Sequence, residues 1–248
     1  MLRAAIAFFT RLPVGRAPLP SSFQGILVWL PVVGLLVGGL VTLAVCLTGL
    51  VLPTSLCGIL GCLVWVLVTG GLHLDGVADC GDGLSVETSP ARRLEIMKDS
   101  RLGTFGGTAL FFVLSLKAVS LAALTESFQN GYESLLSLAG ICCMAAILAR
   151  SLVFLAMRLP SARPEGLGEA LHAGLSRHHE YLALAAGPLI CLLNGWQGLL
   201  AFAAALLMTC FLLSAARKRL GGVTGDVFGC LIESVECTVL VVSTLFLN

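Results

Sequence analysis

The chain has 248 residues, of which 57% are hydrophobic and only 12% are charged, and its mean hydropathy is +0.98. Soluble domains usually carry about 25% charged residues, and a soluble fold of this length could not bury so much apolar surface. The net charge of +1 says nothing about nucleic acid, but the lack of a basic patch interleaved with aromatic residues argues against a nucleic-acid-binding protein. The composition predicts an integral membrane protein, and continuous rather than alternating apolar runs favour helices over a β-barrel.

The chain begins with a short apolar stretch, residues 4–9, between Arg3 and Arg11. It is too short for a secretory signal peptide and lacks a small-residue cleavage pattern. We expect an interfacial half-helix here, with Phe8 and Phe9 in lipid and the two arginines at the headgroups. The three prolines that follow predict an exposed connector.

Further apolar runs predict a polytopic all-α protein with about seven transmembrane helices. The expected spans are residues 24–47, 56–72, 108–124, 134–157, 181–193, 198–215 and 227–246. The fifth is short for a bilayer core of about 30 Å. With no internal repeat and no low-complexity tail, residues 1–248 are expected to form a single domain.

The basic residues are distributed unevenly over these expected loops. All but two of the 15 Lys and Arg residues fall in the N-terminal segment and in the loops after the second, fourth and sixth spans. Since cytoplasmic loops carry the excess of Lys and Arg, we expect the N-terminus and these three loops to face the cytoplasm. The polar motifs of the chain lie in the same loops and can therefore meet at one site.

Three carboxylates follow the second expected span. Asp75, Asp79 and Asp82 are spaced by four and three residues, so on a helix they share one face. Three anions that close repel one another strongly in a medium of low dielectric constant. A hard divalent cation with oxygen ligands would offset this repulsion. The spacing therefore predicts a site for one or two Mg²⁺ ions.

A polar helix is expected at residues 91–101, where Glu95 and Asp99 share a face. Lys98 and Arg101 would supply the cationic partners that phosphate oxygens need. A metal that bridges phosphates also stabilises the leaving group, so the pattern is typical of an enzyme that transfers a phosphate- or pyrophosphate-linked group. The plainer interpretation is a solvated helix face on which the acidic residues pair with basic neighbours.

Some ionisable residues fall inside the expected spans. Glu233 and Glu236 lie in the last one, where charged side chains are costly and are usually either functional or paired. They could simply neutralise Lys117 or Arg150. His73 is either an interfacial histidine held by hydrogen bonds or a general base. The ten cysteines include no CxxC pair, which argues against a zinc or redox site.

Four stretches resemble the cobalamin synthase family, the adenosylcobinamide-GDP ribazoletransferases. They are FTRLPV at 9–14, GGLHLDGVAD at 70–79 with Asp-Gly at 82–83, LEIMKDSRLGT at 94–104 and GGVTGD at 221–226. The stretches are spread along the whole chain and are specific in combination. The Asp-Gly-x-x-Asp core alone would also fit other membrane transferases.

The resemblance implies a phosphotransferase that assembles the nucleotide loop of cobalamin. Members transfer the adenosylcobinamide phosphate moiety of adenosylcobinamide-GDP to α-ribazole or its 5′-phosphate, releasing GMP and forming adenosylcobalamin or its 5′-phosphate. It also implies Mg²⁺ as cofactor and a multi-pass protein of the bacterial cytoplasmic (inner) membrane with its active site facing the cytoplasm. The expected partners are the two substrates and the lipid bilayer, with no nucleic acid; a homo-oligomer stays open.

On this basis we assign roles to individual residues as a hypothesis. The metal ligands are Asp75, Asp79, Asp82 and Glu95; the substrate-binding residues are Arg92, Lys98, Arg101 and Asp226; the catalytic residues are His73, Asp82 and Asp99.

Two alternatives stay open. The first is another Mg²⁺-dependent membrane phospho-alcohol or prenyl transferase, although the chain lacks the fuller motif of those enzymes after Asp82. The second is a cation or solute transporter with Glu233 and Glu236 along its path. Against a transporter, the acidic residues cluster on one side and no inverted repeat is evident.

Overall fold

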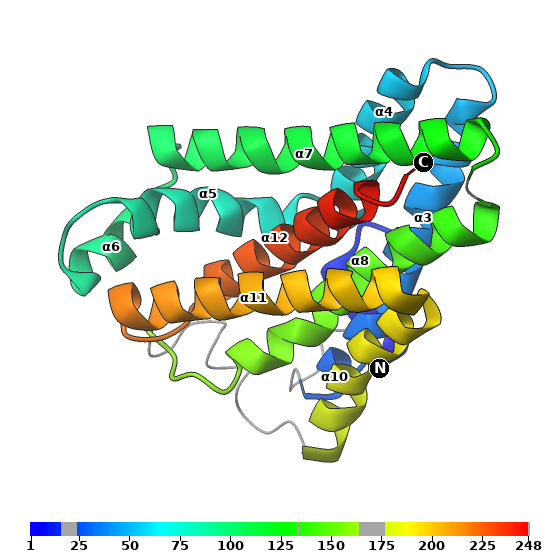
Figure 1. Ribbon diagram of the computed structural model, residues 1–248. Coiled ribbons are helices and arrows are strands. Elements are labelled where there is room, and N and C mark those ends of the chain that lie inside the picture. The colour runs from blue at the N-terminus through cyan, green and yellow to red at the C-terminus, as the bar shows by residue number, and fades with distance from the viewer. Residues whose placement is uncertain (16–23, 133, 164–176, 248) are drawn as a thin grey trace.

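The computed structural model describes residues 1–15, 24–132, 134–163 and 177–247. The regular secondary structure in this part of the chain is helical, apart from an isolated parallel bridge between Ser161 and Val223 (Figure 1). The helices are α1 (Leu2–Phe9), α2 (Gln24–Leu27), α3 (Leu30–Gly49), α4 (Thr54–Thr69), α5 (Leu72–Ser85), α6 (Pro90–Ile96), α7 (Thr104–Gln129), α8 (Leu135–Ala156), α10 (Arg177–Leu193), α11 (Gly195–Leu220) and α12 (Gly225–Thr244). The all-α prediction is confirmed.

Within the described residues, five helices are long and apolar enough to cross a bilayer: α7, α8, α11, α12 and the segment Gly25–Gly49 that contains α3. The pair formed by α4 and α5 makes a sixth span if the two helices, which meet at an angle of 98°, count as one. α10 has only 17 residues and contains Pro188, so it falls short of the roughly 20 residues that a span needs. The expected number of about seven spans is therefore approximate.

The sharp bend between α4 and α5 is made by two consecutive glycines. Gly70 and Gly71 have φ angles of 66° and 68°, in the left-handed region that only glycine adopts at little cost. The backbone N–H of Arg11 donates to the carbonyl of Val68 at 2.7 Å, which ties the N-terminal segment to the bend. After the bend, α5 runs beside the first half of α7 (Figure 1).

Glycines also let α5 lie very close to its neighbours. A β-carbon at Gly76 would lie 2.3 Å from the carbonyl oxygen of Asp226 in α12, and one at Gly81 would lie 2.9 Å from the Cα of Gly106 in α7. Backbones that approach this closely gain dispersion contacts over a long stretch, as in helix pairs within lipid. α5 is thus held between α7 and α12.

The N-terminal helix α1 packs against α2 and the start of α3. Ala5 and Phe9 are buried and Phe8 is half-buried. The expectation that both phenylalanines lie in lipid is therefore wrong, because α1 presents this face to the helix bundle. Arg3 stays exposed and donates from Nε to the carbonyl of Val14 at 2.6 Å.

A buried network of charges joins three long helices. Lys117 of α7 donates to Glu233 and Glu236 of α12, each at 2.6 Å, and Arg150 of α8 donates to Glu236 at 2.6 Å. The ring of Trp65 lies 4.6 Å from the Lys117 ammonium. Two cations and two anions cancel, which makes their burial tolerable. The interpretation that these glutamates neutralise Lys117 and Arg150 is confirmed.

Replacing Glu236 with glutamine should destabilise the protein, because the buried Arg150 guanidinium then loses the carboxylate that neutralises it. We expect the free energy of unfolding to fall by about 3 kcal/mol, measured by SDS titration in mixed micelles. Glu126→Gln, at an exposed position near the far end of α7, is the matched control. Equal unfolding midpoints for the two variants would show that the network does not stabilise the fold.

Candidate active site

The three aspartates of α5 lie on one face, as their spacing predicts. A cavity of about 340 Å³ between α5, α7 and the loop after α6 is lined by Asp75, Asp79, Asp82, Asp99 and Arg101, among others. We refer to it as the acidic cavity. The loop after α6, which forms part of its wall, lies at the end of the molecule where α7 begins and α11 ends (Figure 1).

Asp82 caps the N-terminus of α7 from the neighbouring helix. Its two carboxylate oxygens accept hydrogen bonds from the backbone N–H groups of Gly103 and Gly106, each at 2.8 Å. These N–H groups have no partner within α7, and the positive end of the helix dipole favours the negative charge. Asp82 therefore has a structural role that the sequence did not predict, and only its remaining lone pairs could bind a metal.

Asp75 and Asp79 differ from Asp82, because neither has a hydrogen bond or an ion pair within the described residues. The carboxylate of Asp79 lies close enough to those of Asp226, Asp75 and Asp82 to be repelled by them. Arg163 offsets part of this repulsion, and carboxylates that no hydrogen bond or ion pair satisfies fit a hard cation. Within the described chain, no group of three or more His, Cys, Asp or Glu side chains is arranged to hold a metal. Mg²⁺ needs fewer protein ligands than that, since it usually binds one or two carboxylates together with substrate phosphates and water.

The loop after α6 brings Asp99 and Arg101 to the acidic cavity. α6 ends at Ile96, so the expected helix at 91–101 is too long, and Asp99 does not share a helix face with Glu95. The Arg101 guanidinium donates from Nε to Asp99 at 3.0 Å, and its hydrogen bonds lower the pKa of Asp99 to about 2. Asp99 is therefore anionic at neutral pH and a poor proton acceptor.

Three further residues from the same stretch do not line the acidic cavity. Arg92 and Glu95 form an exposed ion pair of 2.7 Å on α6, as the plainer interpretation expects. Lys98 is exposed. Their assigned roles in substrate and metal binding stay predictions, since the structure does not bring them to the three aspartates.

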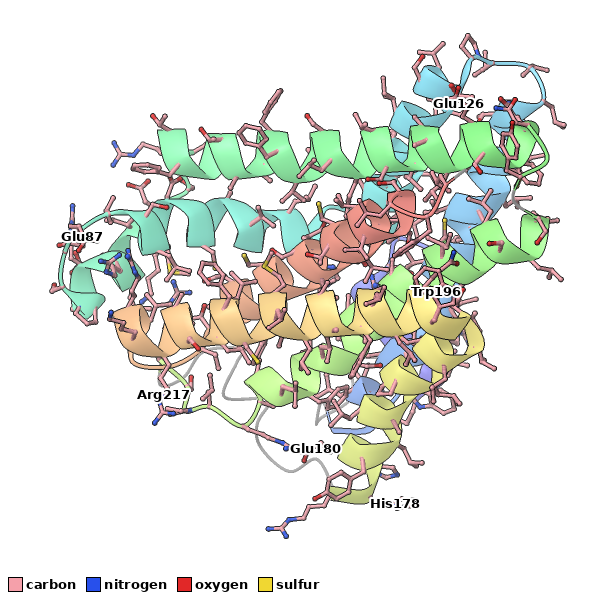
Figure 2. The ribbon with its side chains drawn as sticks, viewed as in Figure 1. Glu87, Glu126, His178, Glu180, Trp196 and Arg217 are labelled. Atoms are coloured by element: carbon pink, nitrogen blue, oxygen red, sulfur yellow. The ribbon has the colours of Figure 1, made fainter. Side chains whose placement is uncertain are left out.

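Two arginines that the sequence analysis missed hold the end of α5. Arg93 is 4% exposed and donates from Nη1 to the carbonyls of Gly83 and Leu84, each at 3.0 Å. Arg219 of α11 also donates to the Leu84 carbonyl. Figure 2 shows Glu87, 3.5 Å from Arg219, at the end of the molecule where α5 leads into α6. These bonds satisfy carbonyls that a helix C-terminus leaves free.

Asp226, in the first turn of α12, is paired with a residue that the sequence analysis also missed. Arg163 donates from Nη1 to Asp226 at 2.8 Å and from Nη2 to the Leu94 carbonyl of α6 at 3.3 Å. The hydroxyl of Thr224 donates to the same carboxylate oxygen of Asp226 at 3.2 Å. Arg163 therefore links the loop after α8 to both α6 and α12.

A second cavity, of about 240 Å³, lies on the other side of α5 and is mostly apolar. We refer to it as the apolar cavity. Asp75 lines both cavities. His73 also lines the apolar cavity; it is 4% exposed, and its Nδ1 has no hydrogen-bond partner among the described residues. His73 also lies near enough to Arg150 and Glu236 of the buried network to feel their charges.

The family model for cobalamin-5-phosphate synthase matches residues 1–244. The chain belongs to this family. It is 38% identical over 248 residues to an adenosylcobinamide-GDP ribazoletransferase of Ectopseudomonas mendocina, covering 99% of this chain and 98% of the relative. It is 40% identical to an adenosylcobinamide-GDP ribazoletransferase of Stutzerimonas stutzeri, covering 97% of this chain and 96% of the relative. It is 36% identical to one of Brevibacillus brevis, covering 96% of this chain and 95% of the relative. No solved structure matches the chain.

In this member of the cobalamin-5-phosphate synthase family, the four stretches that carry the resemblance meet around the two cavities. Phe9, from the first stretch, and Asp226, from the last, line the apolar cavity. Asp99 and Arg101, from the third, line the acidic cavity. The second stretch is α5 itself, which lies between the two. Segments far apart in the sequence thus build one composite site.

Removing the Asp82 carboxylate should weaken the contact between α5 and α7. We expect Asp82→Ala to lower the free energy of unfolding by about 1–2 kcal/mol, the usual cost of losing a helix cap, in the SDS titration. Asp79→Ala is the matched control, because Asp79 lies on the same helix face without a partner. The capping role is refuted if both variants unfold at the same midpoint.

Proposed function

We propose that this protein is an adenosylcobinamide-GDP ribazoletransferase, which joins adenosylcobinamide-GDP to α-ribazole or its 5′-phosphate in the late steps of cobalamin assembly. The observation that carries the proposal is the match of nearly the whole chain to relatives of that name. The chemistry of the site supports it: uncompensated carboxylates and a guanidinium line one cavity, as transfer of a pyrophosphate-linked group requires.

In the reaction, a ribose hydroxyl of the acceptor attacks the phosphorus that carries the cobinamide. The new P–O bond forms as the bond to GMP breaks, and the hydroxyl proton must be removed. Of the assigned catalytic residues, Asp82 and Asp99 are already held by backbone N–H groups and by Arg101, which leaves His73 as the candidate to receive this proton. Asp99, held as an anion by Arg101, is better suited to orient that guanidinium.

The residues that would hold Mg²⁺ are Asp75 and Asp79, with Asp82 contributing through free lone pairs. The ion would neutralise pyrophosphate oxygens and stabilise GMP as it leaves. Arg101 is 88% exposed on its side chain and can turn from Asp99 to a phosphate oxygen. Asp226, paired with Arg163, would position the acceptor at the edge of the apolar cavity.

We place the enzyme in the bacterial inner membrane with this site facing the cytoplasm. The support is the distribution of basic residues, since Arg93, Arg163 and Arg219 all contact elements at the end of the molecule where the acidic cavity lies. The transporter alternative loses its main argument, because Glu233 and Glu236 are paired with Lys117 and Arg150.

The purified protein should release GMP from adenosylcobinamide-GDP when α-ribazole and Mg²⁺ are present, and a chelator should abolish this release. Asp75→Asn and Asp79→Asn should each lower turnover by about 100-fold or more while the unfolding midpoint stays that of the wild type. The control is Glu126→Gln, which should change neither quantity. Absence of GMP release from the wild-type protein would overturn the proposed function, and full activity of both aspartate variants would overturn the metal site.

A further inference from the structure

The apolar cavity is not explained by pyrophosphate chemistry, which needs charged and polar groups. Phenylalanines from two distant helices form much of its wall: Phe8 and Phe9 come from α1, and Phe228 comes from α12. At about 240 Å³ it is smaller than the roughly 300–1,000 Å³ of pockets for whole drug-sized ligands. It can hold one ring system but neither a corrinoid nor a complete nucleotide.

Polar groups reach this cavity at few points. His73, which is 4% exposed, lines it together with the hydroxyl-bearing Ser161 and Thr224. The Arg163–Asp226 pair and Asp75 also line the cavity. The matching ligand is therefore a flat, largely apolar ring with a hydrogen-bonding heteroatom, attached to a polar group.

We propose that the apolar cavity is the subsite for the aromatic base of the acceptor nucleoside. This inference rests on the proposed function and names the part of the site that selects the acceptor. The benzimidazole base of α-ribazole is a flat bicycle with a carbon-only edge and a ring nitrogen, as the lining requires. The guanine of the donor has more polar edge atoms, and the phenylalanine and leucine side chains of this lining would leave those that face them without partners.

The position of Asp75 links this subsite to the reaction. Asp75 lines both cavities and so belongs to the wall between them. A base held in the apolar cavity would therefore bring its attached ribose next to the acidic cavity. The acceptor hydroxyl then lies beside the pyrophosphate, which is the proximity that group transfer needs.

The cavity can be narrowed without disturbing its walls. Gly225 lines it, and a β-carbon built there meets no atom within 4 Å, so Gly225→Leu adds bulk to open space. Met157→Trp, at the C-terminal end of α8, is a second variant with the same purpose, because Met157 also lines the cavity. The matched control is Gly39→Leu on α3. A β-carbon there also meets no atom within 4 Å, and Gly39 lines neither of the two cavities.

The test is equilibrium dialysis of the full-length protein in detergent with labelled α-ribazole and no donor. Gly225→Leu and Met157→Trp should weaken binding about tenfold or more, whereas Gly39→Leu should bind as the wild type does. Excess GDP should not displace the label. In the GMP assay, the KM for α-ribazole should rise in the cavity variants while the KM for adenosylcobinamide-GDP stays unchanged.

The outcomes separate this inference from the proposed function. If wild-type protein binds α-ribazole, the cavity variants do not and no GMP is ever released, the subsite stands and the proposed function fails. If GMP is released but both cavity variants bind α-ribazole normally, the subsite is wrong and the function stands. No saturable binding of α-ribazole, or a co-purified lipid that Gly225→Leu expels without changing α-ribazole binding, also overturns the subsite.

Discussion

The fold depends on how a helix that carries three carboxylates is held among apolar helices. The direction of α5 is set by the two glycines with left-handed backbone angles at its start, and the helix packs closely against α12 at Gly76 and against α7 at Gly81. Its C-terminal carbonyls are bound by Arg93 and Arg219. Because both ends and both sides of α5 are fixed, its acidic face keeps one orientation, and the two cavities keep their places on either side of the helix.

Charge is treated in three different ways within this bundle. Lys117, Arg150 and the two glutamates of α12 cancel one another and lock α7, α8 and α12 together. Asp82 is satisfied by backbone N–H groups at a helix N-terminus. Asp75 and Asp79 receive no such compensation from the described residues. Aspartates on one face of the same helix thus differ in role: Asp82 is structural, whereas Asp75 and Asp79 are left available for a ligand.

Much of this could be predicted from the sequence, because the relevant signals are local. Hydropathy gave the membrane class and the helices, and spacing alone put the three aspartates on one face. The cost of burying charge pointed to pairing of Glu233 and Glu236 with Lys117 or Arg150. Each of these inferences needs only neighbouring residues or a general energetic rule.

The remainder depends on contacts between distant segments. Nothing local in the sequence indicates that Asp82 caps a helix 21 residues away, that Arg163 binds Asp226, or that Phe9 faces a cavity instead of lipid. The helix expected at 91–101 ended early because the residues after Ile96 turn back to the acidic cavity, a tertiary preference that outweighs helix propensity.

The arrangement of two cavities on opposite sides of α5 has a kinetic consequence. Since only one side chain, Asp75, is common to their described walls, each can fill or empty without the other ligand having to leave first. If the two cavities hold the two substrates, as we propose, neither ligand blocks the cavity of the other, and a random order of addition is expected.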